Sequence, residues 1–281
     1  MKSFHDHSTM FISKVYVLIS DMSRSLYFYC DILGLKLLEN KGKESILGTS
    51  HRELIHLIED VHALPQSITL GLYHIALLLP NRVELARMIY RLKEKKYPIT
   101  GASDHGVSEA LYLDDPDGNG IEIYVDRDEK DWPVQHGKMT MFTQALDIKN
   151  LLLELPKYAF ESIHEDTILG HIHLHVDSLK TGHSFFIGVL GFEETLLYGE
   201  SALFISDKGY HHHIGLNTWH EGAPLCEKNQ VGLKGYVLNV PKERYLPFIR
   251  RLEAHHIPLL VELGVSYIID PLEQRVYVNI V

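Results

Sequence analysis

The chain repeats one pattern of predicted elements four times. Residues 14–21 (KVYVLISD) alternate in polarity as a β-strand does, and the amphipathic stretch SRSLYFYCDILG that follows predicts a helix ending at Gly34. Residues 171–178 (HIHLHVDS) begin the pattern again, with a helix ending at Gly191. Two further copies begin at LYHIALLLPNR and at KGYVLNVPKER. Such a repeat restricts the chain to folds assembled from copies of one unit.

Each copy is predicted to contain one strand, one helix and about three more strands. We therefore predict an α+β fold built from four βαβββ modules. The predicted boundaries are, in order, modules at about 9–60 and 70–126 (together residues 9–126), a polar connecting segment at 127–165, and modules at about 168–219 and 230–281 (together residues 166–281).

Composition excludes several classes of function. The formal net charge of −10, without a basic block, argues against nucleic acid as a partner. The chain contains no apolar run near the roughly 20 residues that a membrane span needs, and its N-terminal stretch MKSFHDHSTMFIS has no signal-peptide core. The two cysteines make no disulfide framework, which fits a reducing cytosol, so we expect a cytoplasmic protein.

The segment from His105 to Glu122 (HGVSEALYLDDPDGNGIE) brings together a histidine, a tyrosine and a carboxylate, residue types that serve in iron-dependent oxygen chemistry. Its turn DDPDGNG reverses the chain, because Pro116 fixes φ and glycines tolerate positive φ. The flanking strands alternate in polarity. Since Ile121 and Ile123 point to one side of the strand, Glu122 points to the other side, into a pocket or into water.

This arrangement of repeats resembles the vicinal oxygen chelate superfamily, which includes glyoxalase I, fosfomycin-resistance proteins and type I extradiol dioxygenases. The resemblance covers the chain except for its central segment. It implies that modules pair so that their curled mixed sheets form a metal-holding cup, with ligands on the first and last strand of each module. The repeats assign these two positions, module by module, to Lys14 and His56, His74 and Glu122, His171 and His213, and Gly235 and Tyr277.

Only the second and third modules carry a good ligand set. His74, His171 and Glu122 would form a two-histidine, one-carboxylate triad, which leaves open positions on non-haem Fe(II). Fe(II) is the favoured metal, although Mn(II) and Zn(II) accept the same ligands. The working cup would therefore combine modules two and three, and His171 must lie beside Glu122. Modules one and four would be degenerate copies kept for structure.

The segment His105–Glu122 also resembles the extradiol ring-cleavage dioxygenase signature, a resemblance that implies a role for each residue. The matching positions are His105, Leu111, Tyr112, Asp115, Pro116, Gly118 and Glu122. A catechol-like aromatic diol would bind the metal through its two oxygens, with O2 at the remaining position, and the product would be a muconic semialdehyde. Tyr112 and His105 would hold the edge of the substrate, and His213 would be the acid–base residue.

Several alternatives stay open from the sequence alone. His213 is also compatible with a structural role or with a fourth metal ligand, and the latter would favour a glyoxalase-type isomerase or lyase. A non-catalytic small-molecule-binding protein of the same fold is a third interpretation. Tyr112 can be read as an ordinary strand aromatic, and DPDGNG as the start of a calcium loop, although a plain turn explains it better. The fold is also compatible with a homodimer.

Overall fold

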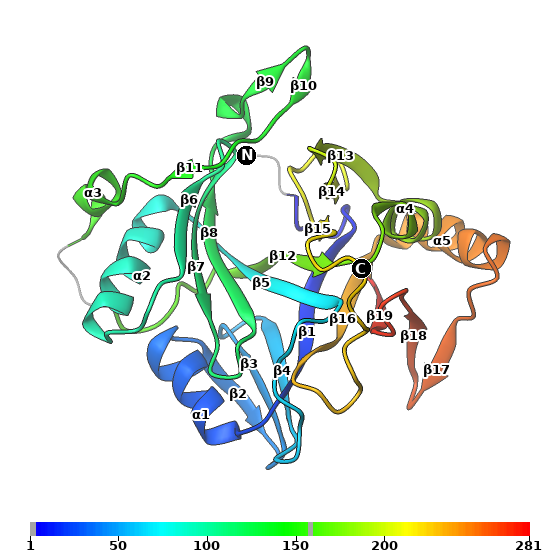
Figure 1. The fold of residues 1–281 in the computed structure, drawn as a ribbon, viewed down its shortest axis with the longest axis horizontal. Helices are drawn as coiled ribbons and strands as arrows, with labels where there is room; N and C mark the ends of the chain where they lie inside the picture. The colour runs from blue at the N-terminus through cyan, green and yellow to red at the C-terminus, as the bar shows by residue number, and fades with distance from the viewer. Residues whose placement is uncertain (1–3, 157–159) are drawn as a thin grey trace.

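The computed structural model describes residues 4–156 and 160–281 and consists mainly of two large mixed sheets (Figure 1). The eight-stranded first sheet has the order β17 (Leu260–Glu262), β18 (Val265–Ile269), β19 (Arg275–Ile280), β16 (Gly232–Val240), β1 (Phe11–Ile19), β4 (Glu53–Glu59), β3 (Glu44–Gly48), β2 (Lys36–Asn40). The nine-stranded second sheet has the order β11 (Gln144–Ala145), β6 (Gly101–Asp104), β7 (Ser108–Asp114), β8 (Gly120–Asp126), β5 (Gly71–Leu79), β12 (Ile168–His175), β15 (Ile214–Asn217), β14 (Ala202–Ser206), β13 (Glu193–Tyr198).

The predicted α+β fold with four repeated units is confirmed, and the sheets show how the units pair. In each unit the first strand runs parallel to the last strand, as β5 does to β8 and β12 to β15. The first strands of different units then pair antiparallel, β5 with β12 and β1 with β16. The second and third units therefore share the second sheet, and the first and fourth units share the first sheet.

Helices from neighbouring units pack in pairs beside the sheets (Figure 1). These helical segments are α1 (Met22–Leu26) with the π-helical turn η1 (Tyr27–Ile32), α2 (Arg82–Glu94), α4 (Leu179–His183) with the π-helical turn η4 (Ser184–Val189), and α5 (Lys242–Ala254). Arg91 of α2 donates to the carbonyl oxygens of Asp31 and Ile32, which follow α1. Arg251 of α5 donates in the same way to the carbonyls of Val189 and Leu190. One arginine thus satisfies the free carbonyls at each π-helical end.

The two predicted helix ends at Gly34 and Gly191 are correct, and both glycines adopt the left-handed backbone that such an end requires. Their φ angles are 86° and 89°. The π-helical turns before them were not predicted, because an i→i+5 bond such as Leu33 N–H to Phe28 C=O leaves no distinct polarity pattern in the sequence.

The connecting segment was predicted at residues 127–165, and residues 157–159 of this range lie outside the described residues. It contains η2 (Glu129–Asp131), a small hairpin of β9 (Val134–Gln135) and β10 (Lys138–Met139), α3 (Ile148–Leu151) and η3 (Leu152–Glu154). The hairpin projects from one end of the molecule, and β11 adds to the edge of the second sheet beside β6 (Figure 1). This segment therefore extends the second sheet as well as linking two units.

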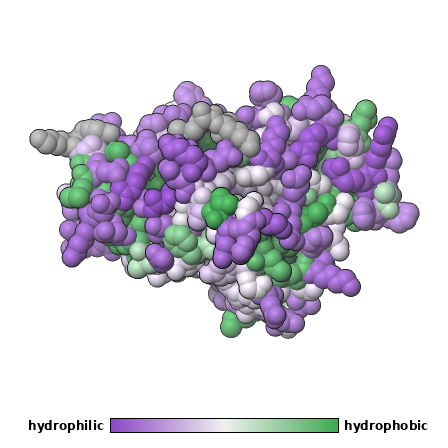
Figure 2. All heavy atoms as spheres, turned by 90° about the horizontal axis from the view of Figure 1, so that it is seen from above, coloured by the Kyte–Doolittle hydropathy of each residue, from purple (hydrophilic) through white to green (hydrophobic). Residues whose placement is uncertain are grey.

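Along the strands, apolar side chains alternate toward the core. The face seen in Figure 2 is mostly hydrophilic with separate apolar patches. On β8, Ile121 and Ile123 are buried in the main core, whereas Glu122 and Tyr124 point to the opposite face of the sheet. Among the described residues, no helix combines the length and the apolar character that a membrane span requires.

The two Asp-Pro turns, in the second and fourth units, are built by the same hydrogen bonds. The Asp115 carboxylate accepts the backbone N–H of Asp117 and of Asn119, and also the Tyr29 hydroxyl at 2.9 Å. The Asp270 carboxylate accepts the N–H groups two and four residues further on, and the Tyr236 hydroxyl at 3.1 Å. The aspartates therefore hold the turns together, which supports the plain-turn interpretation of DPDGNG over a calcium loop.

Asp270 should make stability depend on pH. Burial raises the pKa of Asp270 to about 7 from its ordinary value of 3.8, although three hydrogen bonds oppose the shift. The folded state therefore retains a proton that the unfolded chain releases near pH 4, and this stabilisation is lost as the pH rises from about 4 towards 7. We expect Asp270→Asn to flatten this part of the pH dependence of the urea unfolding midpoint. An unchanged slope would contradict the assignment.

Candidate metal centre

Three potential metal ligands converge on one face of the second sheet. His74 on β5, Glu122 on β8 and His171 on β12 come from three adjacent strands. Glu122 Oε2 lies 2.9 Å from His74 Nε2 and 3.3 Å from His171 Nε2, and the two Nε2 atoms are 3.3 Å apart. All three side chains are buried. The predicted proximity of His171 and Glu122 is thus confirmed.

Strand register explains why the three side chains meet. Ala76 of β5 pairs with Glu122 on one side and with His171 on the other, so the three residues form one row across the sheet. His74 is two positions from Ala76 and points to the same face. Ala76 itself is fully buried and packs in a small cluster with Ala110 and Tyr124.

The donor set fits a divalent cation. Ligand atoms at about 2.1 Å from a metal lie about 3 Å apart when they subtend a right angle, which is close to the separations found here. Burial lowers the pKa of His171 to about 4, so its ring is neutral and its lone pair is available. Burial opposes ionisation of Glu122, yet the two imidazoles hold the pKa of Glu122 well below its ordinary value. Two imidazoles and one carboxylate form the set that binds Fe(II), Mn(II) or Zn(II).

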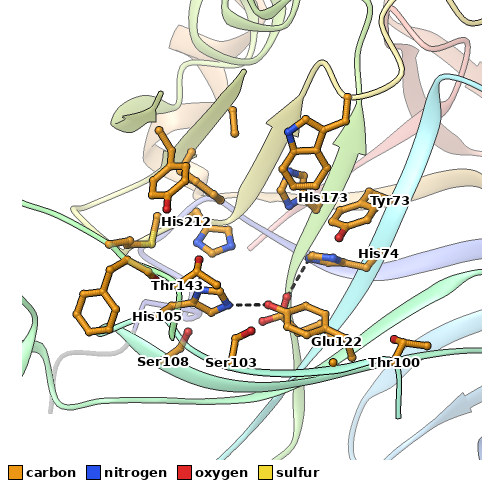
Figure 3. Close-up of a pocket in the computed structure, with 18 residues that line it drawn as sticks. Tyr73, His74, Thr100, Ser103, His105, Ser108, Glu122, Thr143, His173 and His212 are labelled. Carbon is orange, nitrogen blue, oxygen red and sulfur yellow. Dashed lines mark hydrogen bonds and ion pairs between the residues drawn. The ribbon is translucent and has the colours of Figure 1, made fainter. Parts of the chain in front are cut away.

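A cavity of about 490 Å³ opens beside these ligands. This volume is typical of small-molecule sites. Figure 3 shows an ion pair between His74 and Glu122, with His105 and His212 on one side of the cavity and Tyr73 and His173 on the other. Trp219 also lines the cavity, whereas Trp132 packs against Phe4 and Tyr210 elsewhere. Of the two tryptophans, only Trp219 therefore lines this cavity.

Tyr112 and His105 lie together in the cavity wall. Their Oη and Nε2 atoms are 2.8 Å apart. His105 Nδ1 lies 3.2 Å from the carbonyl oxygen of Phe142 in the connecting segment, and a carbonyl can only accept, so Nδ1 carries the proton. In the neutral ring Nε2 then accepts the Tyr112 hydroxyl proton, and the Glu122 carboxylate lies beside the same hydroxyl.

His213 is not part of this cavity. Its Nε2 donates to the carbonyl oxygen of Phe4 at 2.9 Å, and its Nδ1 accepts the backbone N–H of Asp207 at 3.1 Å. Both ring nitrogens are therefore engaged by the backbone, and the ring is fully buried. This position contradicts the sequence-based expectation that His213 faces the substrate, and it agrees with the structural role that was left open.

A two-residue difference in the pairing of the first and last strands of the third unit explains why the repeat alignment selected His213. Tyr16, Ala76, His173 and Val237 occupy equivalent places on the four first strands, and their parallel partners are His56, Glu122, Gly215 and Tyr277. The residue equivalent to Glu122 in the third unit is thus Gly215, not His213. An added Cβ at Gly215 would lie 2.8 Å from the His173 ring, so glycine is required for His173 to fit. The fourth ligand position therefore holds no side chain.

His212, rather than His213, lines the cavity. Its ring centroid is 4.1 Å from that of His171. Residues 210–213 form an irregular connection before β15, so the strand alternation assumed for this histidine run does not apply. Burial lowers the pKa of His212 well below its ordinary value, and the ring is therefore neutral.

His173 is a second cavity residue that the sequence analysis did not select. Its Nε2 accepts from the Asn217 amide at 3.1 Å. Its two-residue spacing from His171 in HIHLH is the signal that could have found it.

The corresponding face of the first sheet is filled by its own side chains. The Tyr16 ring packs against Tyr277 and His56, with ring centroids 4.6 and 4.9 Å away. Lys14, at the position equivalent to His74, pairs with Glu53 at 2.8 Å. Among the described residues, the only cluster of three potential metal ligands is the one on the second sheet.

Comparisons of the sequence agree on the fold and on the type of protein. The family model of the Glyoxalase/Bleomycin resistance protein/Dioxygenase superfamily matches residues 11–123. Catechol-2,3-dioxygenase of Bacillus subtilis (strain 168) is 41% identical over 261 residues, covering 91% of this chain and 90% of that protein. A probable lactoylglutathione lyase of Synechocystis is 29% identical over 131 residues, covering 43% of this chain and 100% of that protein.

Solved structures share the fold at low sequence identity. A putative dioxygenase from Bacillus subtilis has a TM-score of 0.64 and 16% identity, covering 97% of this chain and 86% of its own. Glyoxalase I from Zea mays has a TM-score of 0.60 and 14% identity, covering 97% of this chain and 92% of its own.

Metal binding should depend on the triad and not on its counterpart in the first sheet. We expect Glu122→Gln and His171→Ala to lose most bound iron after Fe(II) reconstitution, measured by elemental analysis. They should also lose the rise in melting temperature that Fe(II) gives the parent protein, since a ligand at 100-fold its Kd adds about 2.7 kcal/mol. His56→Ala, at the position equivalent to Glu122, is the matched control and should bind about as much iron as the parent. Full iron content in Glu122→Gln would contradict the assignment.

Proposed function

Because the chain belongs to the glyoxalase/dioxygenase superfamily and, within it, to the catechol-2,3-dioxygenase-like enzymes, we propose that it is an Fe(II)-dependent extradiol ring-cleavage dioxygenase. The proposed substrates are a catechol-like aromatic diol and O2, which would place the enzyme in the breakdown of aromatic compounds. The 41% identity to a catechol-2,3-dioxygenase over most of both chains supports this class of substrate.

The observation that carries the proposal is the number of protein ligands. His74, Glu122 and His171 can hold a metal from one side, and Gly215 leaves the fourth position without a donor. A three-ligand site of this kind keeps positions open for a bidentate diol and for O2. Bound Fe(II) would supply the oxygen chemistry. No fourth protein ligand is present at the position that would favour the glyoxalase-type alternative.

Two other residues of the cavity would bind the substrate and transfer its protons. Tyr112 would accept a hydrogen bond from a substrate hydroxyl, since its own proton is directed to His105. His212, with its ring beside His171, would take a phenolic proton as the diol binds and return one later in the reaction. In this assignment the acid–base role moves from His213, whose nitrogens are both bonded to the backbone, to its neighbour in the sequence.

The walls of the cavity suit a flat aromatic ring. Tyr73, Phe142, Phe204 and Trp219 supply aromatic surface, and His173 adds a polar edge. Phe142 belongs to the connecting segment, which also orients His105 through a backbone carbonyl. The connecting segment is therefore proposed to close one side of the substrate site.

Ring cleavage itself provides the direct test. Protein reconstituted with Fe(II) without air and then mixed with catechol and O2 should form a yellow ring-fission product. Absorbance would follow product formation, and an oxygen electrode would check that one O2 is consumed per product. Glu122→Gln is the negative control. A fully iron-loaded protein that gives no product with a panel of substituted catechols would contradict the proposal.

The two neighbouring histidines should behave differently. We expect His212→Gln to lower kcat by roughly 10²- to 10⁴-fold, the usual contribution of a general acid–base group. His213→Gln should retain kcat within a few-fold but lose about 1–3 kcal/mol of stability, because it disturbs two buried hydrogen bonds. Steady-state kinetics and urea unfolding on the same preparations would measure both. The reverse order of effects on kcat would restore His213 as the acid–base residue.

A further inference from the structure

We propose that Asp126 and His211 form a proton relay that sets the tautomer of His212 and leads from the substrate cavity to a separate hollow on the surface. This inference rests on the proposed function and deepens it. Neither residue was selected from the sequence, and neither lines the cavity. Both would be positioning residues, because they act on the substrate only through His212.

The relay is a continuous chain of short hydrogen bonds. Asp126 Oδ1 lies 2.7 Å from His211 Nε2, and His211 Nδ1 lies 2.8 Å from His212 Nδ1. The His211 side chain is fully buried, so both of its ring nitrogens are shielded from water. Since Nδ1 of His212 is used in this chain, its Nε2 edge is the one available to the cavity.

Hydrogen-bond direction then fixes the tautomers. A carboxylate only accepts, so His211 carries a proton on Nε2 and, when neutral, has a lone pair on Nδ1. Beside this neutral form of His211, His212 donates its Nδ1 proton to His211. Its Nε2 is left with a lone pair, which is the form a base needs to accept a phenolic proton.

The relay also determines where positive charge resides after proton transfer. When a phenolic proton moves from the substrate oxygen to His212 Nε2, the Nδ1 proton of His212 can move to His211 Nδ1. His212 is then neutral again, and the charge lies on His211 beside the Asp126 carboxylate. This placement avoids an imidazolium ring 4.1 Å from the ring of His171, where a bound cation would repel it. The reverse transfer makes His212 Nε2 an acid.

Asp126 connects this chain to solvent. It ends β8, four residues after Glu122 and on the same face of the strand. Its side chain is 24% exposed, and it lines a surface hollow of about 440 Å³ together with Phe4, Arg127 and Trp132. The Tyr210 hydroxyl donates to both carboxylate oxygens, at 3.1 and 3.0 Å, and holds the carboxylate in place. A proton that reaches Asp126 can therefore pass to solvent in the surface hollow, on the opposite side of the cavity wall from the substrate.

The functional test separates substrate ionisation from ring cleavage. Iron-loaded enzyme is mixed without O2 with 4-nitrocatechol, whose absorbance changes on loss of a proton, in a stopped-flow instrument. We expect Asp126→Asn and His211→Gln to bind the probe but to ionise it at least about tenfold more slowly than the parent. With catechol and O2, kcat should fall similarly while KM changes by less than about threefold. Asp131→Asn, an exposed aspartate five residues away that does not line the hollow, is the matched control and should behave as the parent.

The outcomes distinguish failure of the relay from failure of the proposed function. Parental ionisation rates in both relay variants, with a slow rate in His212→Gln, would overturn the relay and leave the dioxygenase proposal intact. Absence of probe binding by the parent would instead count against the proposed function.

A second measurement tests the relay without any substrate. In ¹⁵N-histidine protein loaded with Zn(II), the N–H···N bond predicts a scalar coupling between the Nδ1 atoms of His211 and His212. The spectrum of His211→Gln would assign these two signals. Loss of this coupling in His211→Gln is expected, and its absence from the parent would overturn the relay.

Discussion

The antiparallel pairing of β5 with β12 is the interaction on which the site depends. It joins the first strands of the second and third units and places His171 opposite Ala76. The parallel pairing of β5 with β8 places Glu122 on the other side of the same alanine. A slip of one residue in either pairing would turn one ligand to the opposite face of the sheet. The buried isoleucines and leucines on that opposite face make such a slip costly, so packing of the core maintains the ligand geometry.

Two units of the chain have the same fold, but their described residues form no cluster of metal ligands. The first and fourth units pair through β1 and β16 in the same way as the second and third. Yet Tyr16, Tyr277 and His56 pack together where the other sheet has ligands and a cavity. The Asp-Pro turn, by contrast, is retained in both halves with the same hydrogen bonds. The hydrogen bonds that stabilise the turn are thus present in both sheets, whereas the metal-ligand side chains are present only in the second sheet.

One backbone carbonyl and one carboxylate determine which atoms donate and which accept in the hydrogen bonds around the cavity. The Phe142 carbonyl fixes the proton of His105 on Nδ1, which in turn directs the Tyr112 hydroxyl. The Asp126 carboxylate is proposed to act in the same way on His211 and His212. In both cases an acceptor on a neighbouring segment would set the protonation of a histidine that lines the cavity.

The sequence alone determined the repeated unit, the strand face of Glu122 and the pair of histidines that join it, because these depend on periodicity and on equivalent positions in the copies. It also identified His105 and Tyr112 by their spacing before Glu122. It selected His213 wrongly, because the extra two residues before β15 lie in an irregular segment where strand alternation carries no information. The positions of His212, His173 and Asp126 around the site became visible only in the tertiary structure. These residues meet the site through contacts between distant segments, and hydrogen-bond direction there depends on partners that no local pattern specifies.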